Sequence, residues 1–242
     1  MNDDKNEVDT NQKKSVKASN GRASNLNDID ALSQYLKSEA GAREGRAIPP
    51  LEKWHPEHVA DMDFVIKANG EWWHEGGKMT RESLVSLFAT ILWKEESNGV
   101  TEYFLKTPMQ KIRIQVEDAP LLVNDVGIVE EEGNRWLEFT TTTGDVVRLD
   151  DAHRVILKAY NPKESNHTAD DGISANTKND LKEVDQSQVR PYILVRNGLM
   201  ALIGRNTFYH LAEIGELTEK DGETILTLQS GGQYYPLSMP TN

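Results

Sequence analysis

The stretch Ile66-Lys67-Ala68-Asn69-Gly70, which continues to Arg81, decides the fold, because Val195-Arg196-Asn197-Gly198, which continues to Arg205, repeats its pattern. Both arginines are followed by apolar residues at the same four spacings, which are three, four, six and seven residues further on. These residues are Leu84, Val85, Leu87 and Phe88 after Arg81, and Phe208, Tyr209, Leu211 and Ala212 after Arg205. A repeat of this kind indicates a duplicated structural unit and sets the architecture before any single motif is interpreted.

The first copy predicts a hairpin, a helix and a second hairpin. Residues 62–67 and 71–74 form the first hairpin around Asn69-Gly70, since both turn residues tolerate a positive φ. Thr80 caps the helix that follows, and a stripe of apolar residues at helical spacing forms its buried face. That stripe consists of Leu84, Leu87, Phe88 and Ile91. Residues 103–105 and 112–116 then pair around Thr107-Pro108.

The second copy predicts the same order in a shorter form. Strands at 192–195 and 199–203 flank Asn197-Gly198, a helix covers 205–214, and Gly215 caps its C-terminus. Strands at 224–228 and 233–237 then flank Ser230-Gly231-Gly232. Between the copies, four further antiparallel strands are expected at 121–129, 135–141, 146–149 and 154–158. Strands dominate and most are antiparallel, so the fold class is α+β with an internal duplication.

The domain organisation follows from composition. Residues 1–25 are expected to be a disordered tail, because they lack the apolar content that offsets ordering entropy. A helical N-terminal segment at 26–47, capped by Asn27 or Asp28, precedes Pro49-Pro50. The first α+β repeat domain covers 48–118. The second covers 119–242 and includes the extra strands and an inserted flexible loop at about 161–188, which is rich in Asn, Ser, Thr, Asp and Lys.

Charge and composition exclude several classes of function. The chain has 242 residues, a net charge of −12 and a pI near 5.0, so it repels phosphate backbones, and a nucleic-acid polymer is not an expected partner. It contains no cysteine, which excludes disulfides and thiolate chemistry. Residues 1–25 lack the apolar core of a signal peptide, and no apolar run reaches the ~18 residues of a membrane helix. We therefore expect a soluble, cytoplasmic protein with no membrane partner.

Six sequence blocks carry a resemblance to a known family. They are Pro49-Pro50-Leu51-Glu52-Lys53-Trp54; Asp61-Met62-Asp63; Thr107-Pro108 with Lys111; Val116-Glu117-Asp118-Ala119-Pro120; Pro191-Tyr192 with Val195-Arg196; and Ser230-Gly231-Gly232 with Pro236-Leu237. In this order they resemble an uncharacterised bacterial family catalogued as domain of unknown function 1285, over about residues 48–160 and 190–238. The resemblance implies a duplicated α+β protein whose second domain is loosely similar to pleckstrin-homology folds. It also implies a ligand site between the domains, with a nucleotide-like ligand and a role in signalling suggested for such proteins.

Arg81 and Arg205 are the first candidates for ligand binding. Each stands at the expected start of a helix, where the positive end of the helix dipole disfavours a cation. A nearby carboxylate, such as Glu82, Glu117 or Asp118, is one way to compensate. An anionic ligand is the other, because a guanidinium beside a helix N-terminus holds phosphate or carboxylate well. The sequence leaves both explanations open.

The leading hypothesis adds further residues to this pair. Ser230-Gly231-Gly232 is either a hairpin turn or a cradle of backbone N–H groups for an anion. Arg196 is expected to pair with the same anion, and Glu117 or Asp118 to meet its amine or hydroxyl groups, unless these carboxylates serve the domain junction. The hypothesis is a non-enzymatic protein that binds an anionic, including nucleotide-like, small molecule at the interface of its duplicated domains, with a role in signal transduction. Neither a Walker A motif nor a dinucleotide glycine fingerprint is present, and the cofactor is unknown.

Two alternatives stay open. His55, His58, Asp61 and Asp63 are possible ligands of a metal-assisted hydrolase, although a catalytic zinc site needs three well-placed ligands. The second alternative is a protein interaction module that binds its partner through strand edges or exposed aromatic residues. Trp72-Trp73 and Tyr234-Tyr235 are the aromatic candidates, because one residue of each pair is expected to point outward and to need a covering partner. No Gly-x-Ser-x-Gly elbow is present, and the balance favours a protein that is not an enzyme.

Overall fold

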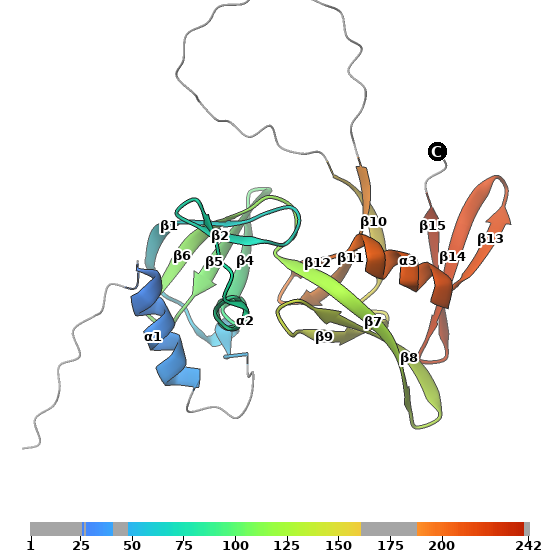
Figure 1. Cartoon of the computed structure of the whole chain (residues 1–242), viewed down its shortest axis with the longest axis horizontal. Coiled ribbons are helices and arrows are strands. Elements are labelled where there is room, and N and C mark those ends of the chain that lie inside the picture. Colours follow the sequence, from blue (N-terminus) through green and yellow to red (C-terminus); the bar gives the residue numbers. More distant parts are fainter. Residues whose placement is uncertain (1–25, 27, 41–47, 161–187, 240–242) are drawn as a thin grey trace, which may run out of the picture.

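The computed structural model describes residues 26, 28–40, 48–160 and 188–239, and these form two halves joined at one junction (Figure 1). Strands dominate both halves and most neighbouring strands are antiparallel, so the predicted α+β class is confirmed. The tail at 1–25 lies outside the described residues, as does the predicted loop except for Gln188, which begins a strand.

The first half is a six-stranded sheet with helices α1 (Ile29–Ala40) and α2 (Glu82–Ala89) packed together at one side (Figure 1). The sheet order is β3-β2-β1-β6-β5-β4, in which β1 and β6 are parallel. A short 3-10 helix, η1 (Leu51–Lys53), precedes it. The strands are β1 (His58–Ile66), β2 (Trp72–His74), β3 (Gly77–Lys78), β4 (Leu92–Ser97), β5 (Val100–Lys106) and β6 (Gln110–Val116).

The two helix starts differ in how well the sequence predicts them. Asp28 Oδ1 accepts a hydrogen bond from Asp30 N at 2.8 Å, so Asp28 shields the start of α1 as expected. The prediction that Thr80 caps α2 is wrong by one residue. Arg81 has the extended backbone of the cap position, and its side chain makes no capping hydrogen bond, so the α2 N-terminus has no side-chain acceptor from its cap residue.

The second half contains two sheets and helix α3 (Arg205–Ile214), which packs against β7 and β13. The larger sheet has the order β10-β11-β12-β7-β8-β9 and the smaller one β13-β14-β15. The strands of the larger sheet are β7 (Leu121–Glu131), β8 (Asn134–Thr141), β9 (Val146–Arg148), β10 (Val155–Tyr160), β11 (Gln188–Arg196) and β12 (Leu199–Ile203). Those of the smaller sheet are β13 (Glu216–Lys220), β14 (Glu223–Ser230) and β15 (Gln233–Met239).

The repeated unit is longer than the sequence predicts. After its helix, each copy forms three consecutive antiparallel strands, β4-β5-β6 in the first half and β13-β14-β15 in the second, instead of one hairpin. The missed strands are joined by Asn98-Gly99 and Asp221-Gly222, whose positive φ values are those of tight hairpin turns. The copies also close differently, because β6 returns to pair with β1, whereas β13-β14-β15 remains a separate sheet.

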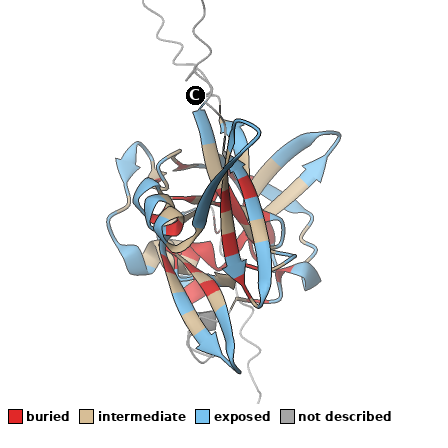
Figure 2. Ribbon diagram, turned by 90° about the vertical axis from the view of Figure 1, so that its right-hand side faces the viewer, coloured by how far each residue is buried: buried red, intermediate tan, exposed pale blue. Residues whose placement is uncertain are grey.

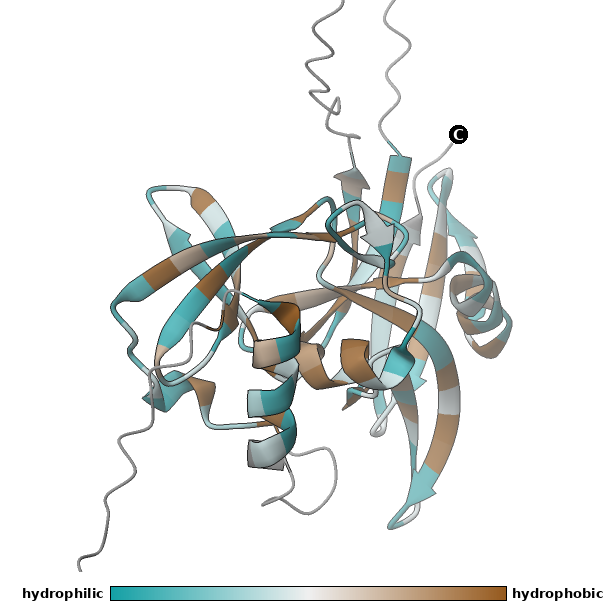
Figure 3. Ribbon diagram, turned by 60° about the vertical axis from the view of Figure 1, so that its left-hand side comes forward, coloured by the Kyte–Doolittle hydropathy of each residue, from teal (hydrophilic) through white to brown (hydrophobic). Residues whose placement is uncertain are grey.

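The core of the first half is built from aromatic rings at right angles. The Phe64 ring lies 5.4 Å from Trp72 and 5.9 Å from Phe88, both edge to face, and all three side chains are buried. Trp73 is half-buried, as expected for the neighbour of a buried strand residue, and its Nε1 donates to Glu71 at 3.2 Å. Buried residues lie in the middle of the strands, whereas the hairpin tips are exposed (Figure 2). Apolar residues are likewise found mainly along the strands and helices (Figure 3).

None of the helices in the described ranges is long and apolar enough to cross a membrane.

Candidate functional site

The hairpin turns of both repeats lie at the junction between the halves. Gly70 has φ +84°, and a Cβ placed on it would lie 2.8 Å from Leu122 Cδ2 in β7 of the second half. A Cβ on Gly198 would lie 3.7 Å from Lys94 Cδ in β4 of the first half. Each Asn-Gly turn therefore faces the opposite half, and Gly70 leaves no room for a side chain.

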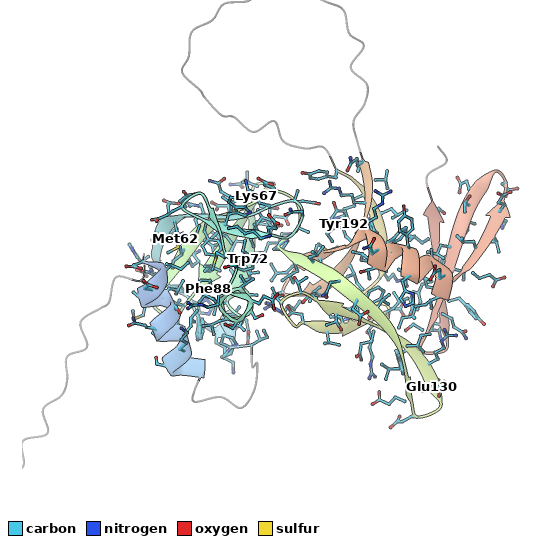
Figure 4. All side chains as sticks on the ribbon, in the orientation of Figure 1. Met62, Lys67, Trp72, Phe88, Glu130 and Tyr192 are labelled. Carbon is cyan, nitrogen blue, oxygen red and sulfur yellow. The ribbon has the colours of Figure 1, made fainter. Side chains whose placement is uncertain are left out.

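A carboxylate in the connection between β6 and β7 holds the halves together. Asp118 accepts hydrogen bonds from Arg190 Nη1 at 2.8 Å and from the Tyr192 hydroxyl at 2.7 Å, both in β11. Its side chain is 7% exposed and that of Arg190 is 22% exposed. The Arg190 guanidinium also stacks 3.6 Å from the Tyr160 ring centroid. Tyr192 lies on the side of its half that faces Lys67 of the other half (Figure 4).

The same network shifts the titration of its members. Burial and the hydrogen bond donated to Asp118 raise the pKa of the Tyr192 hydroxyl well above its usual value. Burial would by itself raise the pKa of the neighbouring Glu117 carboxyl. Hydrogen bonds from Lys67 Nζ at 2.7 Å and Ala68 N at 3.0 Å outweigh it, so the pKa of Glu117 is lowered. Glu117 therefore holds the turn that begins at Lys67 in its own half, whereas Asp118 contacts the second half.

A second buried ion pair meets the end of helix α2. Arg196 Nε donates to Asp145 Oδ1 at 2.8 Å, and Arg196 Nη2 donates to the Ala89 carbonyl of the first half at 2.6 Å. The last carbonyls of a helix lack partners within the helix and carry its negative dipole end, so a guanidinium is a favourable cap. Asp145 Oδ2 accepts from Thr141 and Thr143 hydroxyls, which fixes its orientation. The side chains of Arg196 and Asp145 are 15% and 5% exposed.

One donor of this guanidinium has no acceptor. Among the described residues, Arg196 Nη1 is the only buried side-chain nitrogen or oxygen that lacks a hydrogen-bond partner. A desolvated donor without an acceptor costs about 1–3 kcal/mol, and more when it is charged. Arg196, one of the residues that the sequence indicates, therefore has one donor that no described residue uses.

Arg81 and Arg205, in contrast, are exposed, and their contacts differ. Arg81 marks the start of α2, and its side chain makes no ion pair within the described residues. Arg205 begins α3, where its Nε and Nη2 both donate to the Tyr209 hydroxyl, at 3.2 and 3.1 Å. Among the described residues, neither arginine forms an ion pair with a neighbouring carboxylate. No described contact joins the two arginines to Arg196.

The Ser230-Gly231-Gly232 segment contacts another sheet instead of an open space. The buried Ser230 Oγ accepts from Leu137 N at 3.1 Å, and Gly231 N donates to the Arg135 carbonyl at 2.9 Å, so both groups are used by β8. A Cβ on Gly231 would lie 2.4 Å from the Trp136 ring. Gly231 and Gly232 have φ +58° and +74°, as a tight hairpin turn requires. The geometry supports the hairpin explanation over the anion cradle.

The four candidate metal ligands do not converge. Asp61 pairs with Arg113 Nη1 at 2.7 Å, and His55, His58 and Asp63 are exposed. Within the described ranges, no three histidine or carboxylate side chains come together as a metal-binding group. The hydrolase alternative therefore has no ligand set in this part of the chain.

Sequence reasoning missed the partners that complete the junction, Arg190, Asp145 and Tyr192. Arg190 follows the low-complexity stretch directly, and Asp145 lies in a turn, where an acidic residue is unremarkable. Their contacts join residues separated by 51 to 74 positions, so no local spacing reveals them. The Pro191-Tyr192 block was the available signal for this region.

Comparison with known proteins identifies relatives but no activity. The family model described as the N-terminal domain of DUF1285, a domain of unknown function, matches residues 49–119, and the model described as the C-terminal domain of a DUF1285 protein of unknown function matches residues 165–237. None of the curated proteins matches the chain.

Two solved structures are similar to the chain. The crystal structure of a DUF1285 family protein from Silicibacter pomeroyi DSS-3 has 29% identity and a TM-score of 0.60, over 84% of this chain and 94% of that one. The crystal structure of a DUF1285 family protein from Shewanella baltica OS155 has 26% identity and a TM-score of 0.39, over 63% of this chain and 91% of that one. The two domain matches together cover more than half of the 242 residues, so this chain belongs to the DUF1285 family.

Proposed function

We propose that this protein is a non-enzymatic binding protein for an anionic small molecule, held at the junction of its two halves, with a role in signal transduction. The observation that carries the proposal is the buried Arg196 Nη1, which has no acceptor in the part of the chain that the structure describes. A carboxylate or phosphate oxygen brought to this donor by a small opening of the junction removes the cost of the unmet hydrogen bond.

The surroundings of Arg196 suit an anion of modest size. Asp145 and the Ala89 carbonyl already hold two corners of the guanidinium, so its orientation is fixed before any ligand arrives. The aliphatic stem of Lys94 lies beside Gly198 at the same junction, and its Nζ pairs with the exposed Glu96 at 3.3 Å. Nucleotide phosphates, sugar phosphates and carboxylates all present the required oxygen, so the proposal includes nucleotide-like ligands as one class among these.

The test is thermal unfolding of the full chain with inorganic phosphate, acetate and adenosine monophosphate. An anion that binds only the native state raises the melting temperature. At a concentration of one hundred times its Kd it adds about 2.7 kcal/mol to the free energy of unfolding. Arg196→Lys keeps the charge but loses the forked donors, so the rise should disappear in this variant. Arg113→Lys, which alters an exposed guanidinium of the first sheet, is the matched control and should retain it.

Two results would count against the proposal. One is that none of the three anions stabilises the unmodified protein. The other is that Arg196→Lys and Arg113→Lys retain the full rise, because the anion then binds somewhere else.

A second candidate function rests on strand β13. All five of its residues are exposed, it forms the edge of the smaller sheet, and Leu217 is 55% exposed on it. An open edge of this kind supports addition of a strand from a partner protein. A partner that is captured by the full chain, lost by Leu217→Glu and retained by Arg196→Lys favours this interaction module over the anion-binding protein.

A further inference from the structure

A cavity of 220 Å³ lies at the seam between the two sheets of the second half, away from the junction residues. It lies where β10, the edge of the larger sheet, meets β15, the edge of the smaller one. Its apolar lining comes from Val155, Leu228 and Leu237, and Tyr234 and Tyr235 add aromatic surface. Leu228 and Leu237 are buried and form the floor of this space, whereas Tyr234 is largely exposed and one side is open. We call this space the seam cavity.

The rim of the seam cavity carries one cation and one anion. Arg154 Nη2 forms an ion pair with Asp151 Oδ1, and its guanidinium lies 5.8 Å from the Tyr235 ring centroid. Within the described residues, Nε and Nη1 of Arg154 and Oδ2 of Asp151 have no further partner. Both side chains are mostly exposed, and exposed pairs contribute little stability, so a ligand can add its own charges to this pair at low cost.

The loop that presents these charges is ordered in advance. Asp150 Oδ1 accepts from Ala152 N and His153 N at 2.8 Å and contacts His153 Nδ1 at 2.9 Å. These contacts fix the backbone between Asp151 and Arg154, so the two opposite charges are held at a set separation. A site with fixed charges loses less conformational entropy on binding than a mobile one.

Size and charge together define the ligand class. Sites for drug-sized molecules measure about 300–1,000 Å³, so the seam cavity accommodates a single aliphatic or aromatic group. A simple anion is disfavoured by Asp151 and a simple cation by Arg154. We propose that the seam cavity binds a free α-amino acid with a branched aliphatic or aromatic side chain. Its carboxylate meets Arg154, its ammonium meets Asp151, and its side chain packs against Val155 and Tyr235.

The proposal is tested by calorimetric titration of the full chain with leucine and phenylalanine. At about 0.3 kcal/mol of binding free energy per non-hydrogen atom, leucine reaches a Kd of about 10 mM. The titration therefore extends to about 50 mM. N-acetylleucine removes the ammonium and leucinamide removes the carboxylate, and each loss should weaken binding about tenfold. Saturation by neither amino acid, or equal affinity for either derivative, overturns the proposal.

Variants locate the binding. Arg154→Gln should weaken leucine binding about tenfold, to the level of leucinamide with the unmodified chain. Arg148→Gln is the matched control, since Arg148 also pairs with carboxylates beside an aromatic ring but lies outside the cavity, and it should bind leucine normally. Val155→Phe fills the cavity and should abolish binding while the circular dichroism spectrum is retained. If the folded Val155→Phe variant binds leucine as the unmodified chain does, the seam cavity is not the site.

Discussion

At the scale of single residues, the neighbours Glu117 and Asp118 show how burial sets the value of an ion pair. Each accepts two hydrogen bonds, Glu117 from its own half and Asp118 from the second half. The Glu117 side chain is 41% exposed and that of Asp118 is 7% exposed. Solvent screens the pair between Lys67 and Glu117, whereas removal of Asp118 leaves Arg190 and the Tyr192 hydroxyl short of an acceptor.

We expect Asp118→Ala to lower the free energy of unfolding by about 2–4 kcal/mol, because it strands two partly buried donors. Glu117→Ala, the adjacent control, should cost less than about 1 kcal/mol. Urea denaturation of both variants measures the two losses. Equal losses would mean that Asp118 is no more desolvated than Glu117 and would contradict the buried network.

Tyr192 gives the junction a dependence on alkaline pH. Its pKa is raised in the folded protein, while the unfolded chain titrates near its usual value of about 10. The folded state therefore keeps a proton that the unfolded state loses, so this contribution is complete below about pH 10 and is lost as the pH rises further.

The Tyr192→Phe variant should lose about 1 kcal/mol at pH 8, since its hydrogen bond to Asp118 is gone. Between pH 10 and 11 its stability should fall less steeply than that of the unmodified protein, by up to about 1.4 kcal/mol per pH unit. Tyr209→Phe, at an exposed position of α3, is the control and should keep the original slope. Parallel slopes for Tyr192→Phe and the unmodified chain would show that Tyr192 does not titrate as proposed.

At the scale of elements, the contact between β8 and the β14-β15 turn decides how the smaller sheet is held. Gly231 approaches the Trp136 ring so closely that a Cβ would overlap it, whereas the nearest atom to a Cβ on Gly232 is 3.8 Å away. Both glycines have a positive φ, so substitution introduces similar backbone strain at both positions. The two positions differ in the contact with Trp136.

Gly232→Ala should cost about 1–2 kcal/mol, the strain of a non-glycine residue in the left-handed region. Gly231→Ala should cost a further 1–3 kcal/mol, roughly, because the methyl group displaces the Trp136 ring. Thermal unfolding with tryptophan fluorescence reports both the stability and the ring environment. A Gly231→Ala variant as stable as Gly232→Ala would mean that the turn does not pack on β8.

Local patterns predict the elements well because their causes lie within a few residues. The Asn197-Gly198 turn, helix 205–214 and the Gly215 cap position all follow from short spacings. Gly215, however, is extended at φ −82°, and it is glycine because a Cβ would lie 2.6 Å from Leu226, which is a tertiary reason. The candidate site is less predictable because its contacts are tertiary. Arg196 was identified, but its partners Asp145 and Ala89 are brought to it only by folding.

At the scale of the whole molecule, the close approach of Gly70 to Leu122 tests whether the halves behave as one unit. Gly70→Ala should cost about 1–3 kcal/mol more than Gly99→Ala, since both have positive φ but a Cβ on Gly99 meets nothing within 4 Å. Adding Leu122→Ala should recover part of that excess, because the double variant removes the overlap.

Denaturant unfolding of the unmodified chain, Gly70→Ala, Leu122→Ala and the double variant measures this coupling. If the effects of Gly70→Ala and Leu122→Ala are simply additive, the turn and β7 are not in contact.

The two Asn-Gly turns that reach into the opposite half have a consequence for how this protein associates. In a dimer of identical subunits, both sides of a twofold contact carry the same residues, and dilution separates them. Here one polypeptide carries both partners, so their effective concentration is set by the chain and dilution has no effect. The opposing surfaces are also free to diverge, and they have done so, with Leu122 facing Gly70 and Lys94 facing Gly198.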